Sequence, residues 1–202
     1  MTGVQTCALP IYANYALAQC VLQEVTGLSA HEVLRTQVFQ PAGMTRTGQS
    51  HSTATDEELA GLKIAPVWVK GAEISHIRAL SAGSADGGAV TTLEDMVRFQ
   101  EALHEGDLLD RDLLARLARP RSRLRAGLHY GTGLATIRFS EFMPLILRGL
   151  PEPMGGLGLW AVHSFFYPRQ RAHVVMNLHS TAQMQRSFAL HIAIARRLAR
   201  LS

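Results

Sequence analysis

The sequence predicts an α+β fold, with helices first, antiparallel strands next and one helix closing the chain. Three observations lead to this prediction. Apolar residues recur at helical spacing as far as Ala118. Residues 134–140, 162–167 and 172–178 then alternate apolar and polar side chains, as strands do. Residues 183–201 return to the helical period.

The first part of the chain is predicted to hold two helices. Residues 15–26 have apolar side chains at helical spacing, and Gly27 suits the left-handed residue that ends many helices. Ser29-Ala-His-Glu32 matches a capping box, in which both side chains satisfy backbone N–H groups at a helix start. The second helix should therefore begin there and end at Pro41 and Gly43.

The middle of the chain is predicted to hold an extended segment and two more helices. Residues 64–69 are apolar, and Pro66 argues against a central strand. Thr91-Thr-Leu-Glu94 forms a second capping box, so a helix should open there and close near Gly106. Residues 110–118 are predicted to form a further short helix.

The last part is predicted to be a hairpin followed by a helix that packs on a sheet. Residues 168–171 (Pro-Arg-Gln-Arg) separate two alternating stretches and suit a hairpin turn. In the final helix Phe188, Ile192 and Leu198 share one face, which should therefore contact the sheet.

Length and composition indicate one globular domain. The chain has 202 residues, enough to bury a core, and 47% of them are hydrophobic against 18% charged. The net charge is +4, and most basic residues are arginines, gathered at residues 111–125 and in the last helix. A nucleic-acid surface would need aromatic residues interleaved with this cluster for stacking, and none is. We therefore expect arginines on solvated helix faces and no nucleic-acid partner.

No membrane span, disulfide or metal site is expected. The longest apolar runs are far shorter than the roughly 20 residues that a span needs. Cys7 and Cys20 lack a CxxC spacing, and Cys20 should be a small core residue of the first helix. Neither a metal nor an organic cofactor is implied. Four histidines near the C-terminus lack an HxH or HExxH spacing: His163, His173, His179 and His191.

Two stretches carry a resemblance: ANYALAQCVLQEVTGLSAHEVLRTQVFQPAGMTRTG from Ala13, and SADGGAVTTLEDMVRFQEALHEGDLLD from Ser81. They are similar to the β-lactamase-related serine hydrolases, the group of class C β-lactamases, D-alanyl-D-alanine peptidases and related esterases. The resemblance covers residues 13–202 and implies a β-lactamase/transpeptidase-like fold. It implies one incomplete domain, mainly helical over 13–128, with sheet strands and a C-terminal helix packed on the sheet over 129–202.

The nucleophile motif of that family is absent from this sequence. Its members attack with the serine of Ser-x-x-Lys, whose lysine accepts the hydroxyl proton. The only lysines here, Lys63 and Lys70, follow Ala60 and Val67 at that spacing. Residues 1–12 begin with MTGVQTCALPI, which is uncharged, aperiodic and similar to a translated sequencing adapter. We expect residues 1–12 to be non-native and the N-terminal part of the fold to be missing. The alternative is a natural, shortened homologue that begins near Tyr12.

A second family motif, Tyr-x-Asn, has a tyrosine that accepts or relays a proton. Tyr12-Ala-Asn14 matches it, which makes Tyr12 a candidate catalytic residue and Asn14 a candidate substrate contact. The alternative is an accidental match, because counting back from the following helix places the family's tyrosine at Pro10.

The third family motif, Lys-Thr-Gly or His-x-Gly, begins the strand that lines the substrate site. Met154-Gly-Gly-Leu-Gly158 occupies that place. Gly156 stands where the cation belongs, Leu157 where a hydroxyl is common, and Gly158 at the motif's glycine. These three residues are predicted to keep the shape of the substrate edge without its positive charge.

Two side chains near this edge are further candidates for substrate binding. Trp160 is expected either to wall the cleft or to lie in the core. His163 is a candidate to replace the missing cation electrostatically.

The resemblance implies that the intact parent hydrolyses a small-molecule amide or ester, or a peptide-like substrate, through an acyl-enzyme without a cofactor. This chain alone is predicted to be inactive because it lacks Ser-x-x-Lys. The alternative is a non-catalytic homologue that binds a peptide or cell-wall ligand in the same cleft. Members of the family are typically bacterial and often exported to the periplasm or cell surface. The sequence leaves the compartment and the oligomeric state open.

Overall fold

A six-stranded antiparallel sheet forms the centre of the computed structural model, which describes residues 13–49, 64–75 and 89–201. The strands lie in the order β10-β9-β8-β7-β6-β5, so each pairs with its neighbour in sequence. Antiparallel neighbours need only tight connections, as between β9 and β10, where the predicted turn is found. The strands are Ser122–Arg125 (β5), Leu128–Tyr130 (β6), Ala135–Ile137 (β7), Met154–Gly158 (β8), Val162–Tyr167 (β9) and Ala172–Asn177 (β10).

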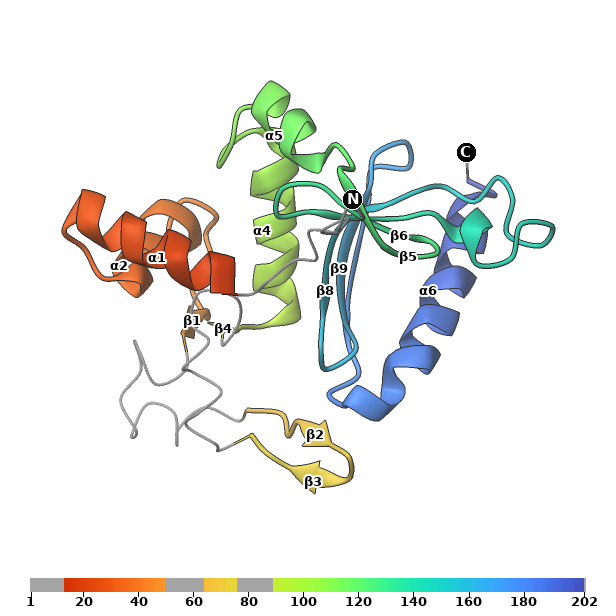
Figure 1. Ribbon diagram of the computed structural model, residues 1–202, viewed down its shortest axis with the longest axis horizontal. Helices are drawn as coiled ribbons and strands as arrows, with labels where there is room; N and C mark the ends of the chain where they lie inside the picture. Colours follow the sequence, from red (N-terminus) through yellow and green to blue (C-terminus); the bar gives the residue numbers. More distant parts are fainter. Residues whose placement is uncertain (1–12, 50–63, 76–88, 202) are drawn as a thin grey trace, which may run out of the picture.

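Helices cover both faces of this sheet (Figure 1). α4 (Leu93–Glu105) contacts β9 and β10 on one face, and α6 (Met184–Leu198) packs on the other. α5 (Arg111–Ala118) follows α4 and contacts it. α1 (Ala13–Thr26) and α2 (Ala30–Leu34), which continues into a π-helical turn at Arg35–Phe39, lie on the side of α4 away from the sheet.

Short elements complete the described part of the chain. Two-residue strands pair as β1 (Gly48–Gln49) with β4 (Ala89–Val90), and as β2 (Trp68–Val69) with β3 (Ala72–Glu73). Single 3-10 turns occur at Phe139–Glu141 and Thr181–Gln183. The antiparallel sheet, the helices beside it and the closing helix confirm the predicted α+β class.

The main hydrophobic core lies between the sheet and α6. Phe165 and Tyr167 of β9 are fully buried there, together with alternate residues of β7 and β10. Phe188, Ile192 and Leu198 of α6 pack against them, as the helical spacing predicts. Burial of large aromatic side chains on this face is the main force that holds α6 to the sheet.

Three local predictions are wrong. The N-cap of α4 is Thr92, whose hydroxyl accepts the N–H of Asp95 (3.2 Å), so the helix starts one residue later than a cap at Thr91 implies. The strand predicted over residues 134–140 ends at Ile137, because a 3-10 turn follows. Cys20 is exposed, not part of a core, because nothing in the described part packs on that side of α1.

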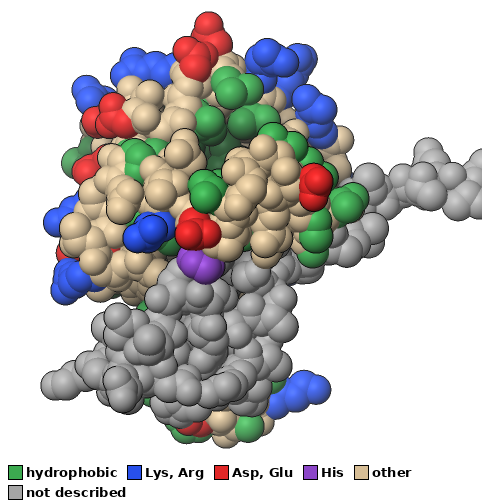
Figure 2. Space-filling view, turned by 90° about the vertical axis from the view of Figure 1, so that its left-hand side faces the viewer, with side chains coloured by type: hydrophobic (Ala, Val, Ile, Leu, Met, Phe, Trp, Pro, Cys, Tyr) green, Lys and Arg blue, Asp and Glu red, His purple; other side chains and the backbone are tan. Residues whose placement is uncertain are grey.

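The apolar side of α1 is open to solvent. Leu17, Val21 and Val25 are 66%, 55% and 78% exposed. Figure 2 views the molecule from the α1 and α2 side, where basic and acidic side chains are interspersed and hydrophobic side chains lie open between them. Across the described ranges, no helix is both long enough and apolar enough to cross a bilayer.

Candidate functional site

Strand β8 has an open edge along its second half. All five residues of β8 pair with β9, but β7 pairs only with Met154 and Gly155. Among the described residues, Gly156, Leu157 and Gly158 therefore have no strand on their β7 side. Such an edge offers backbone N–H and C=O groups to an extended ligand. The same three residues were predicted from the sequence to contact substrate, and that role stays a prediction.

Packing against β9 explains two of the glycines in β8. A Cβ on Gly155 would lie 2.0 Å from the carbonyl oxygen of Ser164, and one on Gly158 would lie 2.9 Å from the Cβ of Val162. Gly156 differs, because its φ is not left-handed and no atom of the described residues lies within 4 Å of where a Cβ would stand. The fold therefore requires glycine at Gly155, disfavours a larger residue at Gly158 and leaves Gly156 free to vary.

The two faces of β8 differ in what they contact. Directly opposite residues of an antiparallel pair point to the same face. Gly156 lies opposite Ser164, which contacts α4, and Leu157 lies opposite His163, which contacts α6. Leu157 packs against the main core. The structure thus places Gly156 and Gly158 on the α4 face and separates them from Leu157 and His163.

A buried polar pair lies on the α4 side of this strand. The Nε2 atom of Gln100 donates to the hydroxyl of Ser164 at 2.8 Å, and these residues are 2% and 7% exposed. The Oε1 atom of Gln100 has no hydrogen-bond partner among the described residues. Because Ser164 lies opposite Gly156, this pair lies beside the open edge. Neither Gln100 nor Ser164 was predicted from the sequence. The signal that could have indicated Gln100 is its place on the same face of the helix as Phe99 and Leu103, where a polar residue is unusual.

His163 lies in a buried network between β9 and α6. Its Nε2 atom is 2.8 Å from the hydroxyl of Ser187, and its Nδ1 atom is 3.0 Å from Nδ1 of His191. All three residues are 0% exposed. The Ser187 hydroxyl donates to the carbonyl of Met184 (2.8 Å), so its oxygen accepts the hydrogen bond from Nε2–H of His163. The Nδ1 atom of His163 must then accept from Nδ1–H of His191, which assigns one tautomer to each ring.

Both imidazoles of this network are neutral at neutral pH. Burial lowers the pKa of His163 to about 4. Burial, and then the neighbouring His163, lower the pKa of His191 to about 3. The structure therefore gives His163 a place in the core, away from Gly156, and a neutral ring there supplies no positive charge to the open edge.

A second pair of histidines lies between α4 and the sheet. His104 of α4 stacks on Phe166 of β9 (4.3 Å between ring centroids), which stacks in turn on His173 of β10 (4.8 Å). Burial, and then His173, lower the pKa of His104 to about 4. Within the described ranges, no three His, Cys, Asp or Glu side chains are grouped so that they could hold a metal ion.

The remaining predicted residues are Trp160, Asn14 and Tyr12. Trp160 is half-buried in the β8–β9 connection, where its carbonyl accepts the N–H of Ser180 (3.2 Å). Asn14 is exposed on α1, which lies across α4 from the sheet (Figure 1). The structure therefore does not bring Asn14 beside Gly156. Tyr12 lies outside the described residues.

Comparison with known proteins gives a family and a fold. The model of the Beta-lactamase family matches residues 11–198. No curated protein matches the sequence significantly. Many solved structures match this chain. Three of them are less than 25% identical to it in sequence, so their similarity shows a shared fold.

Three of these structures illustrate the match. A D-amino acid amidase from Ochrobactrum anthropi SV3, complexed with L-phenylalanine amide, has a TM-score of 0.72 at 21% identity over 95% of this chain and 58% of its own. A penicillin binding protein from Bacillus halodurans has a TM-score of 0.69 at 24% identity, with 91% and 54% covered. A Beta-Lactamase/D-Alanine Carboxypeptidase from Pseudomonas syringae has a TM-score of 0.63 at 12% identity, with 89% and 57% covered.

The chain therefore spans little more than half the length of these relatives. The fold that it shares with them has the order predicted from the sequence: a helical region, antiparallel strands and a C-terminal helix on the sheet. With a family match over residues 11–198 of 202, this protein belongs to the Beta-lactamase family.

Proposed function

We propose that this chain supplies the substrate-binding strand and the helical wall of an amide- or ester-hydrolysing enzyme. The open edge of β8 at residues 156–158 carries the proposal, because an extended substrate can add to it as a further strand. Open space beside Gly156 leaves room for a side group of that substrate. The similarity to a D-amino acid amidase supports an amide as the bond that is cleaved.

The reaction we propose is acyl transfer to a serine that this chain does not carry in a Ser-x-x-Lys motif. In such a reaction the serine oxygen attacks the carbonyl carbon, and backbone N–H groups stabilise the negative oxygen that develops. The part of this chain is to bind and orient the substrate along β8. We propose that the serine and lysine belong to a longer parent protein, and that the chain alone forms no acyl-enzyme.

Covalent labelling tests this proposal directly. The purified 202-residue protein is incubated with a fluorescent penicillin or a fluorophosphonate probe, denatured by heat and examined on a gel. We expect no label, because no activated serine is present. A serine hydrolase treated in parallel shows that the probes react. A heat-stable label on any serine of the native chain, absent after prior denaturation, would contradict the proposal.

The genomic sequence before the Met1 codon tests the proposed parent. An in-frame Ser-x-x-Lys upstream supports a hydrolase of which this chain is the C-terminal part. A stop codon and a ribosome-binding site directly before Met1 would support a second function instead.

That second function is binding without catalysis of a peptide or cell-wall ligand at the same edge. It is favoured by the absence of Ser-x-x-Lys and by Gly156, which carries no charge where the family has a cation. Calorimetric binding of a cell-wall peptide by the unmodified chain, without turnover, would support it.

A further inference from the structure

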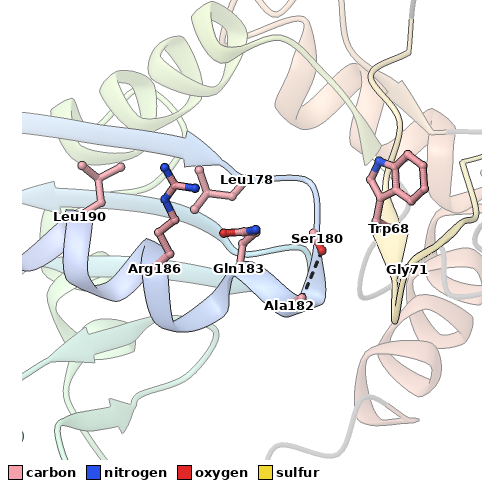
Figure 3. A pocket seen from close by; sticks show the side chains of 8 residues that line it. All are labelled: Trp68, Gly71, Leu178, Ser180, Ala182, Gln183, Arg186 and Leu190. Atoms are coloured by element: carbon pink, nitrogen blue, oxygen red, sulfur yellow. Dashed lines mark hydrogen bonds between the residues drawn. The ribbon is translucent and has the colours of Figure 1, made fainter.

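A pocket of about 700 Å³ lies between the β2–β3 hairpin and the start of α6 (Figure 3). Small-molecule sites in proteins commonly have volumes of roughly 300–1,000 Å³. The pocket lies on the α6 side, whereas Gly156 is on the α4 face. It is close to the end of β8, because the N–H of Ser180 donates to the carbonyl of Trp160 in the β8–β9 connection (3.2 Å). The residues that line it are Trp68, Gly71, Leu178, Ser180, Ala182, Gln183, Arg186 and Leu190.

The walls of this pocket are mainly apolar. Trp68 and Leu190 are 40% and 44% exposed, and Leu178 lies between them at the end of β10. Figure 3 shows Trp68 on the hairpin side, with Gln183, Arg186 and Leu190 along one face of α6. An exposed tryptophan and two leucines around one hollow provide a surface for an apolar ring or chain.

Arg186 is the cationic residue that lines this pocket. No acidic side chain pairs with it among the described residues, where other arginines such as Arg98 and Arg138 do have carboxylate partners. An arginine guanidinium can hold a carboxylate through two parallel hydrogen bonds. Among the described residues, the pocket therefore combines apolar walls with one positive charge that no carboxylate neutralises.

The start of α6 adds to this preference for an anion. α6 continues directly from the 3-10 turn Thr181–Gln183, whose N-cap Ser180 accepts the N–H of Ala182 through its hydroxyl (3.3 Å). The first turn of α6 contains no acidic residue. The first N–H groups of a helix lack partners within the helix, and their positive end favours negative charge. Gln183 and Arg186 both line the pocket, so the helix end and the guanidinium act on the same space.

Backbone contacts hold the two sides of the pocket together. The N–H of Trp68 donates to the carbonyl of His179 (2.8 Å), and Trp68 forms a β-bridge with Ser180. His179 has a left-handed φ of 56°, and its own N–H donates to the side chain of Asn177 (2.8 Å). The tryptophan wall is therefore attached to the same loop that leads into α6.

We propose that this pocket binds a small amphipathic carboxylate. Its carboxylate would pair with Arg186 at the start of α6, and its apolar part would lie against Trp68, Leu178 and Leu190. This inference does not depend on the proposed hydrolase function, since it uses neither β8 nor an upstream serine.

Isothermal titration calorimetry of the full chain tests the proposal with phenylacetate, its neutral analogue phenylacetamide, and acetate. We expect phenylacetate to bind more tightly than either of the others, because it alone has both the charge and the ring. Arg186→Gln should weaken phenylacetate binding about ten- to a hundredfold, the range for loss of a charge-assisted hydrogen bond. It should leave phenylacetamide unchanged, and Trp68→Ala should weaken both ring-bearing ligands.

Arg116→Gln is the matched control, because Arg116 is exposed on α5 outside this pocket. Far-UV circular dichroism shows that each variant is folded. A peptide ending in a free phenylalanine carboxylate, compared with phenylacetate, distinguishes a site for peptide C-termini from one for free acids. Absence of phenylacetate binding at millimolar concentration, or equal binding by the Arg186→Gln variant, would overturn the proposal.

Discussion

Two neighbouring glycines in β8, Gly155 and Gly156, differ in whether the fold has room for a side chain at their position. Gly155 is required because a Cβ would lie 2.0 Å from a β9 carbonyl oxygen, whereas Gly156 has open space at that position. We expect Gly155→Ala to lower the free energy of unfolding by about 1–3 kcal/mol, as overpacking does. Gly156→Ala should leave it unchanged or raise it by a few tenths of a kcal/mol, since a less flexible unfolded chain favours folding.

Urea unfolding followed by circular dichroism measures both variants under the same conditions. The pair serves as its own control, because the substitutions are chemically identical and adjacent. Equal losses of stability would show that β8 does not pack on β9 as described.

Position 156 is uncharged at the substrate edge that we propose. In a parent protein that carries Ser-x-x-Lys, we expect Gly156→His to raise kcat/KM for carboxylate-bearing substrates. A charge-assisted hydrogen bond contributes about 1.5–3 kcal/mol, which corresponds to roughly one to two powers of ten in rate. The open space beside Gly156 admits the imidazole without displacing β9.

The test compares a carboxylate-bearing amide with neutral nitrophenyl acetate at a pH where the new histidine is charged. Gly156→Gln is the matched control, because it adds a side chain of similar size without charge. Equal changes on both substrates would discard the charge argument.

At the scale of elements, the interface between β9 and α6 contains a buried polar network inside an apolar core. The folded-state pKa values of His163 and His191 are about 4 and 3, below the ordinary value of 6.5. Between those values and pH 6.5 the unfolded chain binds more protons than the folded one. The free energy of unfolding should therefore fall as the pH drops from about 6.5 towards 3, and it should recover as the pH rises.

Chemical unfolding between pH 7 and pH 5 measures this slope. Carboxylates such as Glu141, whose pKa is lowered from 4.5 to about 2, lose their stabilising effect as the pH falls from about 4.5 towards 2. The window between pH 7 and pH 5 lies above that range, so it reports mainly the histidines. His191→Phe should reduce the slope, although it leaves Nδ1 of His163 unpaired and costs stability at every pH. It should not abolish the slope, because His104 and His173 also have lowered pKa values. A slope identical to that of the unmodified protein would contradict the assigned burial.

At the scale of the whole molecule, the described part leaves a large apolar surface uncovered. Leu17, Val21 and Val25 lie on one open side of α1, and β10 is an outer strand of the sheet. Exposed apolar patches and strand edges promote association. We expect the purified chain to aggregate, or to remain dispersed and bind a hydrophobic dye strongly.

Dye fluorescence measures the exposed apolar surface, and light scattering measures aggregation of the same sample. Replacing Leu17, Val21 and Val25 by glutamine should lower dye binding while leaving the Tm nearly unchanged, because these side chains contribute little buried area. A dispersed monomer that binds no dye and melts cooperatively would contradict the prediction.

The helices were predictable because their signals are local. The periods and end signals for α1, α5 and α6 come from residues within a few positions of each other, and Asp110 caps α5 where a helix was expected. The start of α4 was displaced by one residue because Thr91 and Thr92 are both competent caps.

Strands without a local signal were not predictable. β5 reads Ser-Arg-Leu-Arg and β8 reads Met-Gly-Gly-Leu-Gly, and neither has the branched or aromatic residues typical of strands. Both are strands because their neighbours in the sheet hold them. The motif comparison nonetheless predicted a strand at residues 154–158, because it depends on order along the chain and not on strand propensity. Its prediction that residues 156–158 contact substrate stays a prediction.

The sequence by itself determined the order of the elements and the family resemblance, because both are read from patterns of residues close together along the chain. It also showed that Ser-x-x-Lys is absent and that position 156 is an uncharged glycine. Only the tertiary structure decided which side chains share a face with that position. It placed Gln100 against Ser164, 64 positions away, and His163 against His191, 28 positions away. Such contacts depend on strand register and on burial between layers, and those arise only when distant segments pack together.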